Sequence, residues 1–274
     1  MMRVNHLFQG PEITVSRLDH QAEAGYSDSD EEVCANYAVN FVEAGSFGLT
    51  VERASYTLSA ESVFVSRPGA VHRYTHLERA PSDVCVSVVY SENFVTEIPA
   101  KDYFASRKVP VAIDPTNRLR FLKLSLAQLA DDGYSIALED WACELISAIG
   151  AGLSNNNRLY RPHQLNWYAE RVQAVQELFQ SRYAEPHSLS SVARLVGMSP
   201  FQFSRVFSEL AGLPPHRYLL RVRLDRARQM LLDGKSVTET CFDVGFSNLS
   251  HFTRSFRKRF GNVPSSLKST RNQT

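Results

Sequence analysis

The chain has 274 residues, of which 43% are hydrophobic, 22% charged and 11% aromatic. This composition is typical of a globular protein and excludes a disordered or fibrous one. No apolar run approaches the roughly 20 residues of a membrane helix, and the polar opening segment Met1–Thr14 lacks the apolar stretch of a signal peptide. We therefore expect a cytoplasmic protein without a membrane partner.

The cysteines give no indication of disulfides. The sequence has four of them, and no two are close together: Cys34, Cys85, Cys143 and Cys241. This spacing predicts reduced thiols, mostly in the core, rather than a disulfide framework or a CxxC site. Redox or metal sensing by Cys34 or Cys85 is the alternative to simple packing.

The net charge of +1 conceals opposite charges in the two halves of the chain. Residues 1–165 carry 14 Lys and Arg against 21 Asp and Glu, whereas residues 166–274 carry 16 against 8. A compact basic domain most often binds nucleic acid, although a solvated basic surface is compatible with the same charge. Together with the polar stretch at 154–164, the charges predict an N-terminal domain (1–153), a linker (154–164) and a C-terminal domain (165–274).

The acidic half begins with a predicted β unit. Residues 33–90 are rich in Val, Phe, Tyr and Thr in short runs separated by Gly and Pro, and Val84–Tyr90 is the clearest strand. His72, Tyr74 and His76 alternate, so on a strand they share one face. Three interpretations fit such a face: a pocket for a small organic ligand, a metal site or a structural surface. We expect these three residues to bind an effector, with no metal and no cofactor.

Two amphipathic helices are predicted after the β unit. We expect Asp114-Pro115 to cap the first helix and Ser135 to open the second. Leucines recur at helical spacing in the first: Leu119, Leu122, Leu126 and Leu129. The second has a similar stripe: Leu138, Ala142, Leu145 and Ile149. Such stripes need a partner, and we favour packing on the β unit with some contribution to a homodimer.

A motif in the basic half occurs twice. Phe203-x-Arg205-x-Phe207-x4-Gly212-x2-Pro215 recurs as Phe252-x-Arg254-x-Phe256-x4-Gly261-x2-Pro264, 49 residues later. Each copy is predicted to contain two helices joined by a tight turn at Gly197 or Gly245. In the first copy, Ser199 is expected to cap the second helix, with Pro200 at the first helical position. In the second copy, Ser236 and Glu239 are expected to form a capping box on the first helix, and Ser247 to cap the second. The arrangement predicts helix-turn-helix units, whose second helix enters the DNA major groove.

The second helix of each copy has an apolar stripe and an outward face. The residues expected to be buried are Phe203, Val206, Phe207 and Leu210 in the first helix, and Phe252, Phe256 and Phe260 in the second. Arginine suits bidentate contact with guanine, Gln can read adenine, and Ser or Asn can contact bases or phosphates. The predicted DNA contacts are Phe201, Gln202, Ser204, Arg205, Asn248, Ser250, His251, Arg254, Arg257 and Lys258. Salt bridges in solvent are the alternative for the arginines.

A helix at Pro215–Leu232, closed by Asp233-Gly234, is predicted to join the two copies, and another at Leu165–Tyr183 to open the domain. The joining helix carries five arginines that would set the spacing of the two units and contact phosphates: Arg217, Arg221, Arg223, Arg226 and Arg228.

The motifs of the basic half resemble those of the AraC/XylS family of bacterial transcription regulators. The matching strings are Leu189-x3-Ala193-x3-Gly197-Met198-Ser199, Phe203-Ser204-Arg205-x-Phe207, Arg223-Leu224-x2-Ala227 and Val244-Gly245-Phe246-Ser247-x4-Phe252-Thr253-Arg254-x-Phe256-x4-Gly261-x2-Pro264. The resemblance covers about the last 105 residues. It implies two helix-turn-helix units bridged by a linker helix. Cys241 in place of the usual alanine, and Ser265-Ser266-Leu267 without a tyrosine–arginine pair, are departures outside the reading faces.

The acidic half is similar to the cupin-like effector domain of the same family. This similarity rests on the order Phe41–Gly48, Leu58–Val65 and Arg67–His72, with Glu61-Ser62 where Gly-Asp is usual. The expected fold class is α+β multidomain: a cupin-like antiparallel β-barrel with two helices, followed by an all-α domain with two helix-turn-helix motifs.

The expected function is a ligand-responsive, sequence-specific transcription regulator that is not an enzyme. Its expected partners are double-stranded DNA at an asymmetric major-groove site, a small-molecule effector, a second copy of the chain and RNA polymerase. The alternatives are a cupin-type metal-dependent enzyme with a DNA-binding tail and a ligand-independent DNA-binding regulator. The sequence leaves open whether the regulator is an activator or a repressor.

Overall fold

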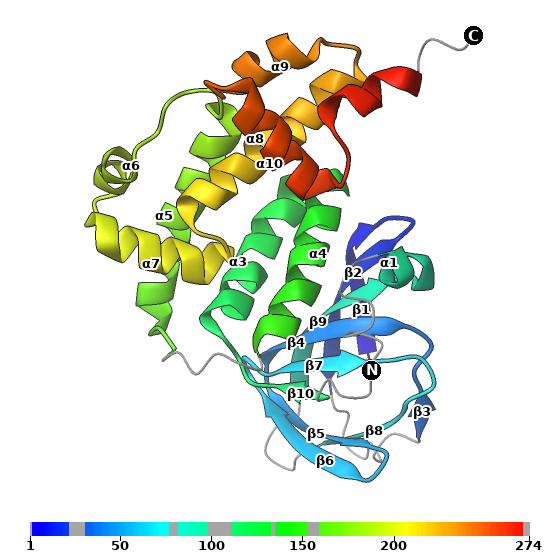
Figure 1. Ribbon diagram of the computed structural model, residues 1–274. Helices are drawn as coiled ribbons and strands as arrows, with labels where there is room; N and C mark the ends of the chain where they lie inside the picture. Colours follow the sequence, from blue (N-terminus) through cyan, green and yellow to red (C-terminus); the bar gives the residue numbers. More distant parts are fainter. Residues whose placement is uncertain are drawn as a thin grey trace. The chain divides into compact units, whose positions relative to one another are not determined.

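The computed structural model describes residues 2–21, 31–76, 82–97, 111–132, 135–152 and 159–270 (Figure 1). The chain divides into two compact units, residues 1–160 and 161–274. The first is rich in β-strands and the second is helical, which confirms the predicted combination of classes. Part of the predicted linker, residues 154–158, lies outside the described residues. Within the described ranges, no helix is both long and apolar enough to cross a membrane.

Ten described strands form two antiparallel sheets in the N-terminal unit. One sheet has six strands in the order β1-β2-β9-β4-β7-β10, and the other has four in the order β3-β8-β5-β6. The strands are β1 (Met2–Gln9), β2 (Ile13–Gln21), β3 (Glu32–Val33), β4 (Tyr37–Ala44), β5 (Ser46–Val51), β6 (Ala54–Ser59), β7 (Val63–Ser66), β8 (Val71–His76), β9 (Ser82–Tyr90) and β10 (Ala112–Ile113). A short helix, α1 (Glu92–Glu97), follows β9. The predicted strand Val84–Tyr90 is confirmed as part of β9, whereas β1 and β2 were not predicted.

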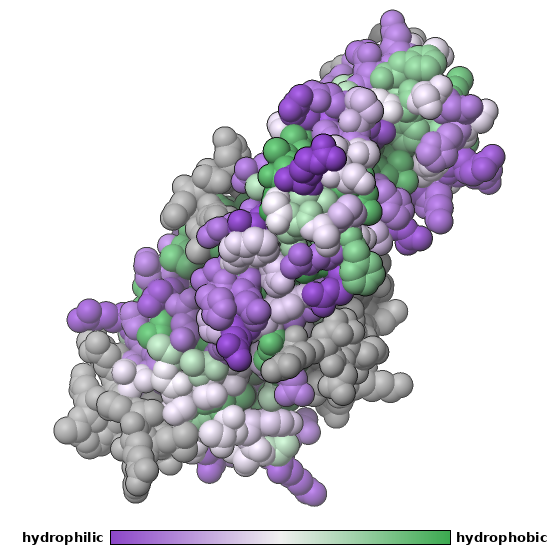
Figure 2. Space-filling view, turned by 90° about the vertical axis from the view of Figure 1, so that its left-hand side faces the viewer, coloured by the Kyte–Doolittle hydropathy of each residue, from purple (hydrophilic) through white to green (hydrophobic). Residues whose placement is uncertain are grey.

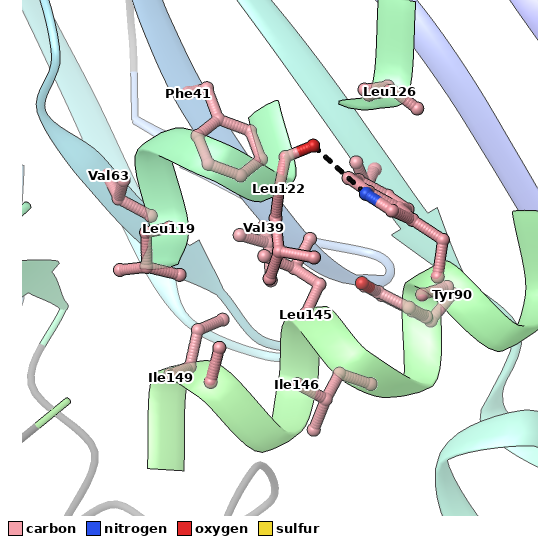
Figure 3. Packing of buried hydrophobic residues seen from close by; sticks show 14 of the residues in the cluster. Val39, Phe41, Val63, Tyr90, Leu119, Leu122, Leu126, Leu145, Ile146 and Ile149 are labelled. Atoms are coloured by element: carbon pink, nitrogen blue, oxygen red, sulfur yellow. Dashed lines mark hydrogen bonds between the residues drawn. The ribbon is translucent and has the colours of Figure 1, made fainter. Parts of the chain in front are cut away.

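Two helices cover one face of the six-stranded sheet: α3 (Asn117–Asp132) and α4 (Ser135–Gly152). Figure 3 shows side chains of both helices packed against the sheet: Leu119, Leu122, Leu126, Leu145, Ile146 and Ile149 against Val39, Phe41, Val63 and Tyr90. The Trp141 indole N–H donates a hydrogen bond to the Leu122 carbonyl at 3.0 Å, which fixes α4 to α3. The predicted packing of these stripes on the β unit is confirmed.

The start of α3 differs from the prediction. The hydroxyl of Thr116, not the Asp114 side chain, accepts a hydrogen bond from the Leu119 N–H at 3.1 Å. The backbone carbonyl of Thr116 also accepts the Arg120 N–H. Thr116 is therefore the N-cap, two residues later than expected. The opening of α4 at Ser135 agrees with the prediction.

The other face of the six-stranded sheet packs on the four-stranded sheet. Successive side chains on a strand point to opposite faces, so β4 directs Val39 and Phe41 to the helices and Val42 to a second core. This second core contains residues of both sheets: Val42, Phe47, Leu49, Val51, Leu58, Phe64 and Cys85. The unit is thus layered as helices, sheet and sheet.

The C-terminal unit has six described α-helices and a terminal 3-10 helix, η1 (Pro264–Thr270). The α-helices are α5 (Pro162–Ser181), α6 (Leu189–Leu195), α7 (Pro200–Ala211), α8 (Pro215–Leu232), α9 (Val237–Asp243) and α10 (Leu249–Phe260). The pairs α6–α7 and α9–α10 each turn at a glycine with positive φ, Gly197 (67°) and Gly245 (84°). The predicted positions of both turns are confirmed.

The helix caps follow the sequence closely, with one correction. Ser199 accepts from the Gln202 N–H and Ser236 accepts from the Glu239 N–H, as predicted. The predicted cap at Ser247 is wrong. Asn248 caps α10, because its side-chain oxygen accepts from the His251 N–H at 3.0 Å. One of the predicted DNA contacts, Asn248, therefore has a structural role.

Aromatic and aliphatic side chains together form the interior of the C-terminal unit. Phe203, Phe207, Phe252 and Phe256 are each at most 1% exposed, which confirms their predicted burial, whereas Phe260 is only partly buried against the second cluster. Polar side chains predominate on the face of the molecule seen in Figure 2, with smaller hydrophobic areas between them. The buried stripes fix which faces of α7 and α10 remain available to a partner.

Candidate nucleic-acid interface

The outward face of α7 combines an aromatic, an amide and a basic side chain. Phe201 is 82% exposed, and Arg205 is exposed as well, whereas Gln202 and Ser204 are partly buried. The Gln202 amide donates to the Tyr168 hydroxyl at 3.2 Å, so α5 orients this side chain. The side-chain carbonyl oxygen of Gln202 can still accept a hydrogen bond from a partner.

The outward face of α10 is more basic. Ser250, His251, Arg254, Arg257 and Lys258 are all exposed. Four of them, together with Leu249, Thr253 and Val263, line an open hollow of about 750 Å³: Ser250, Arg254, Arg257 and Lys258. The helix thus gathers cationic groups around one concave surface.

The basic side chains predicted to contact DNA have no acidic partner among the described residues. Within the described parts of the chain, Arg205, Arg254, Arg257 and Lys258 form no ion pair. Arg259, on the same helix as three of them, is instead held by two hydrogen bonds of 2.8 Å from its guanidinium to the Asp225 carboxylate. The salt-bridge alternative therefore applies to Arg259 and not to the four predicted contacts.

The arginines of α8 differ from one another in their surroundings. Arg221 lies over the Tyr218 ring, with 4.9 Å between its guanidinium carbon and the ring centroid, and Arg228 lies over Phe260 at 5.6 Å. The predicted phosphate contact of Arg223 stays a prediction. The guanidinium of this residue donates to three backbone carbonyls inside the unit, at 2.7–2.9 Å. Three of its five N–H donors are therefore used within the protein.

In the N-terminal unit, two of the three predicted effector-binding residues lie together on β8. His72 is 1% exposed, and its Nδ1 lies 3.3 Å from the Cys34 Sγ and 3.4 Å from the Tyr74 hydroxyl oxygen. Burial lowers the pKa of His72 and raises the pKa values of Cys34 and Tyr74, which favours the neutral forms of all three groups. The side chain of His76 lies outside the described part of the structure.

Within the described residues, no three His, Cys, Asp or Glu side chains are grouped so that they could hold a metal ion. The neighbour of His72 that the sequence did not predict is Cys34. It lies 38 residues earlier in the chain, and it reaches β8 through the pairing of β3 with β8.

Comparison with known proteins finds relatives mainly for the C-terminal unit. Residues 192–270 match the family model of a helix-turn-helix domain. The chain is 35% identical over 98 residues to the virulence regulon transcriptional activator VirF of Yersinia enterocolitica, covering 35% of this chain and 36% of that protein. It is 23% identical over 220 residues to the uncharacterised HTH-type transcriptional regulator YbfI of Bacillus subtilis, covering 78% of each.

A solved structure of a probable AraC family transcriptional regulator from Rhodopseudomonas palustris is 31% identical, with a TM-score of 0.35, and covers 36% of this chain and 94% of that one. The segment at residues 192–270 is thus similar to helix-turn-helix domains of transcription regulators. This similarity agrees with the resemblance to the AraC/XylS family that the motifs of the same segment predict. The match spans only 36% of the length of VirF.

Proposed function

We propose that this protein is a sequence-specific, DNA-binding transcription regulator in which both helix pairs act as helix-turn-helix units. The observation that carries the proposal is the equivalence of α7 and α10. Both helices have 12 residues and a polar N-cap, and both end at a glycine with left-handed backbone conformation, Gly212 or Gly261. Both bury an aromatic stripe and present an exposed arginine at the same position of the repeat, Arg205 or Arg254. Neither arginine has an acidic partner among the residues that the structure describes.

Two reading helices in one chain imply an asymmetric DNA site. Helices held by one linker helix on the same DNA face should meet major-groove segments about 10–10.5 base pairs apart. A palindrome is not required, because both helix pairs belong to one chain rather than to two symmetric partners. We propose that α7 reads one segment and α10 the other.

Selection of a randomised double-stranded DNA library by the full chain, followed by footprinting, tests this proposal. We expect an asymmetric consensus and two protected major-groove segments about one helical turn apart. Protection of a single segment, or enrichment of palindromes only, would contradict the use of both helix pairs. Failure to enrich any sequence would contradict sequence-specific binding altogether.

Lys258→Ala tests the electrostatic part of the interface. If Lys258 contacts a phosphate, the slope of log affinity against log salt concentration should become shallower by about 0.9, with base preference unchanged. Arg259→Ala is the matched control, because it removes the same charge from the same helix but Arg259 is paired with Asp225. Equal changes of slope in the two variants would show that only net charge matters.

For the N-terminal unit we propose a cupin-like barrel, built from the two sheets, that binds a small organic effector next to His72 and Tyr74. The proposal is supported by the polar groups that these residues and Cys34 bring into the interior. Screening small molecules for thermal stabilisation of the full chain tests it, because a ligand that binds only the folded state raises stability. Homodimerisation and contact with RNA polymerase stay predictions.

A further inference from the structure

Arg223 of α8 makes an unusual set of contacts for a residue on a helix surface. Its Nε donates to the carbonyl of Tyr183 at 2.7 Å, its Nη2 to the carbonyl of Glu185 at 2.8 Å and its Nη1 to the carbonyl of Gly245 at 2.9 Å. All three acceptors are backbone groups. Hydrogen bonds from a charged donor are shorter and stronger than those between neutral groups, so this guanidinium fixes main-chain positions.

The three carbonyls belong to different halves of the C-terminal unit. Tyr183 and Glu185 lie in the segment between α5 and α6, which leads into the first helix pair, whereas Gly245 forms the turn between α9 and α10. The two segments are also in direct contact. A Cβ placed on Gly245 would lie 2.4 Å from the carbonyl oxygen of Ala184, so only glycine permits this approach of the two backbones.

We propose that Arg223 is a positioning residue that fixes the spacing between the two DNA-reading helices, α7 and α10. This inference rests on the proposed function, because spacing matters only if both helices bind the same DNA. Besides the covalent path through α8, the turn that precedes α10 is tied to the segment that precedes α6. A rigid tie between them fixes the separation of DNA segments that the protein can read.

The geometry explains why arginine, rather than lysine, performs this role. A guanidinium is planar and presents five N–H donors in a fixed fork, whereas an ammonium is a compact group on a flexible stem. A lysine side chain at this position would keep the positive charge but could not donate to three carbonyls in the directions that Arg223 uses. Arg223→Lys therefore separates positioning from charge.

The experiment measures the affinity of the full chain for its selected DNA site and for altered DNA sites. In the altered sites, one or two base pairs are inserted or removed between the two half-sites, which are the segments that α7 and α10 read. One inserted base pair rotates the second half-site by about 34°, since a helical turn has about 10.5 base pairs. We expect the wild type to lose at least about tenfold in affinity for each changed spacing. Arg223→Lys should bind the original site about tenfold more weakly and lose no more than about threefold on a change of spacing.

Arg217→Lys is the control, because Arg217 lies exposed on the same helix and the substitution is chemically the same. It should keep the wild-type dependence on spacing. If Arg223→Lys bound more weakly than the wild type by the same factor at every spacing, the variant would keep the wild-type dependence on spacing. That result would overturn the positioning role while leaving the proposed DNA-binding function intact.

A second measurement needs no variant and covers the case in which Arg223→Lys does not fold. When the wild type selects from a library in which the spacing between half-sites is itself randomised, the selected sites should share a single spacing. A broad distribution of spacings would overturn the inference. Absence of any sequence selection would overturn the proposed function, and the inference with it.

Discussion

Replacing Arg254 with alanine is expected to weaken binding to the specific DNA site by about 1–3 kcal/mol and to relax sequence preference in one half of the site only. Arg205→Ala should do the same in the other half. Both side chains are exposed, occupy equivalent positions of the repeat and have no acidic partner in the described structure. Their donors are thus available for the acceptors of a guanine edge.

Library selection repeated with each variant is the measurement, together with the affinities for the selected site and for unrelated DNA. Arg194→Ala is the control, because it removes an exposed arginine from α6 rather than from a reading helix. It should leave base preference unchanged. If Arg205→Ala or Arg254→Ala weakened binding equally on all DNA sequences, that arginine would be a phosphate contact.

Local features of the C-terminal unit could be predicted from its sequence. The turn glycines, the caps at Ser199 and Ser236 and the buried phenylalanines all depend on residues within a few positions of each other. The wrong N-cap prediction for α10 also concerns neighbouring residues. Ser247 and Asn248 are both good N-cap residues, and the choice between them depends on the backbone at Asn248, which is extended with φ −147° and ψ 122°.

The interactions that escaped prediction are long-range. Arg223 is one of five similar arginines on α8, and its carbonyl acceptors lie 40, 38 and 22 residues away in the chain. The contact of His72 with Cys34 spans 38 residues. Strand β1 was missed for another reason. Its side chains are exposed except that of Phe8, which is partly buried. The alternation of apolar and polar residues in Met2–Asn5 is short and ends near His6, where the register with β2 shifts, so it does not identify a half-buried strand.

The second large effect concerns the core beneath α7. Phe207→Ala should destabilise the C-terminal unit by about 3–5 kcal/mol, the usual cost of removing a buried phenylalanine. Phe207 is fully buried, and its ring centroid lies 5.5 Å from those of Phe203 and Tyr218 and 6.2 Å from that of Phe179. The substitution would leave a cavity where α5, α7 and α8 meet.

Phe201→Ala is the matched control, since it makes the same change on the same helix at a side chain that is 82% exposed. Its effect on stability should stay within about 0.5 kcal/mol, although it is expected to reduce DNA binding. Hydrogen–deuterium exchange, followed peptide by peptide, reports the stability of this unit separately from the N-terminal unit. Equal destabilisation by the two substitutions would mean that Phe201 packs in the protein, and it would then not be available on the reading face of α7. Loss of DNA binding without loss of stability in Phe201→Ala would instead assign the two phenylalanines to different faces of the helix, Phe207 to the core of the fold and Phe201 to the DNA partner.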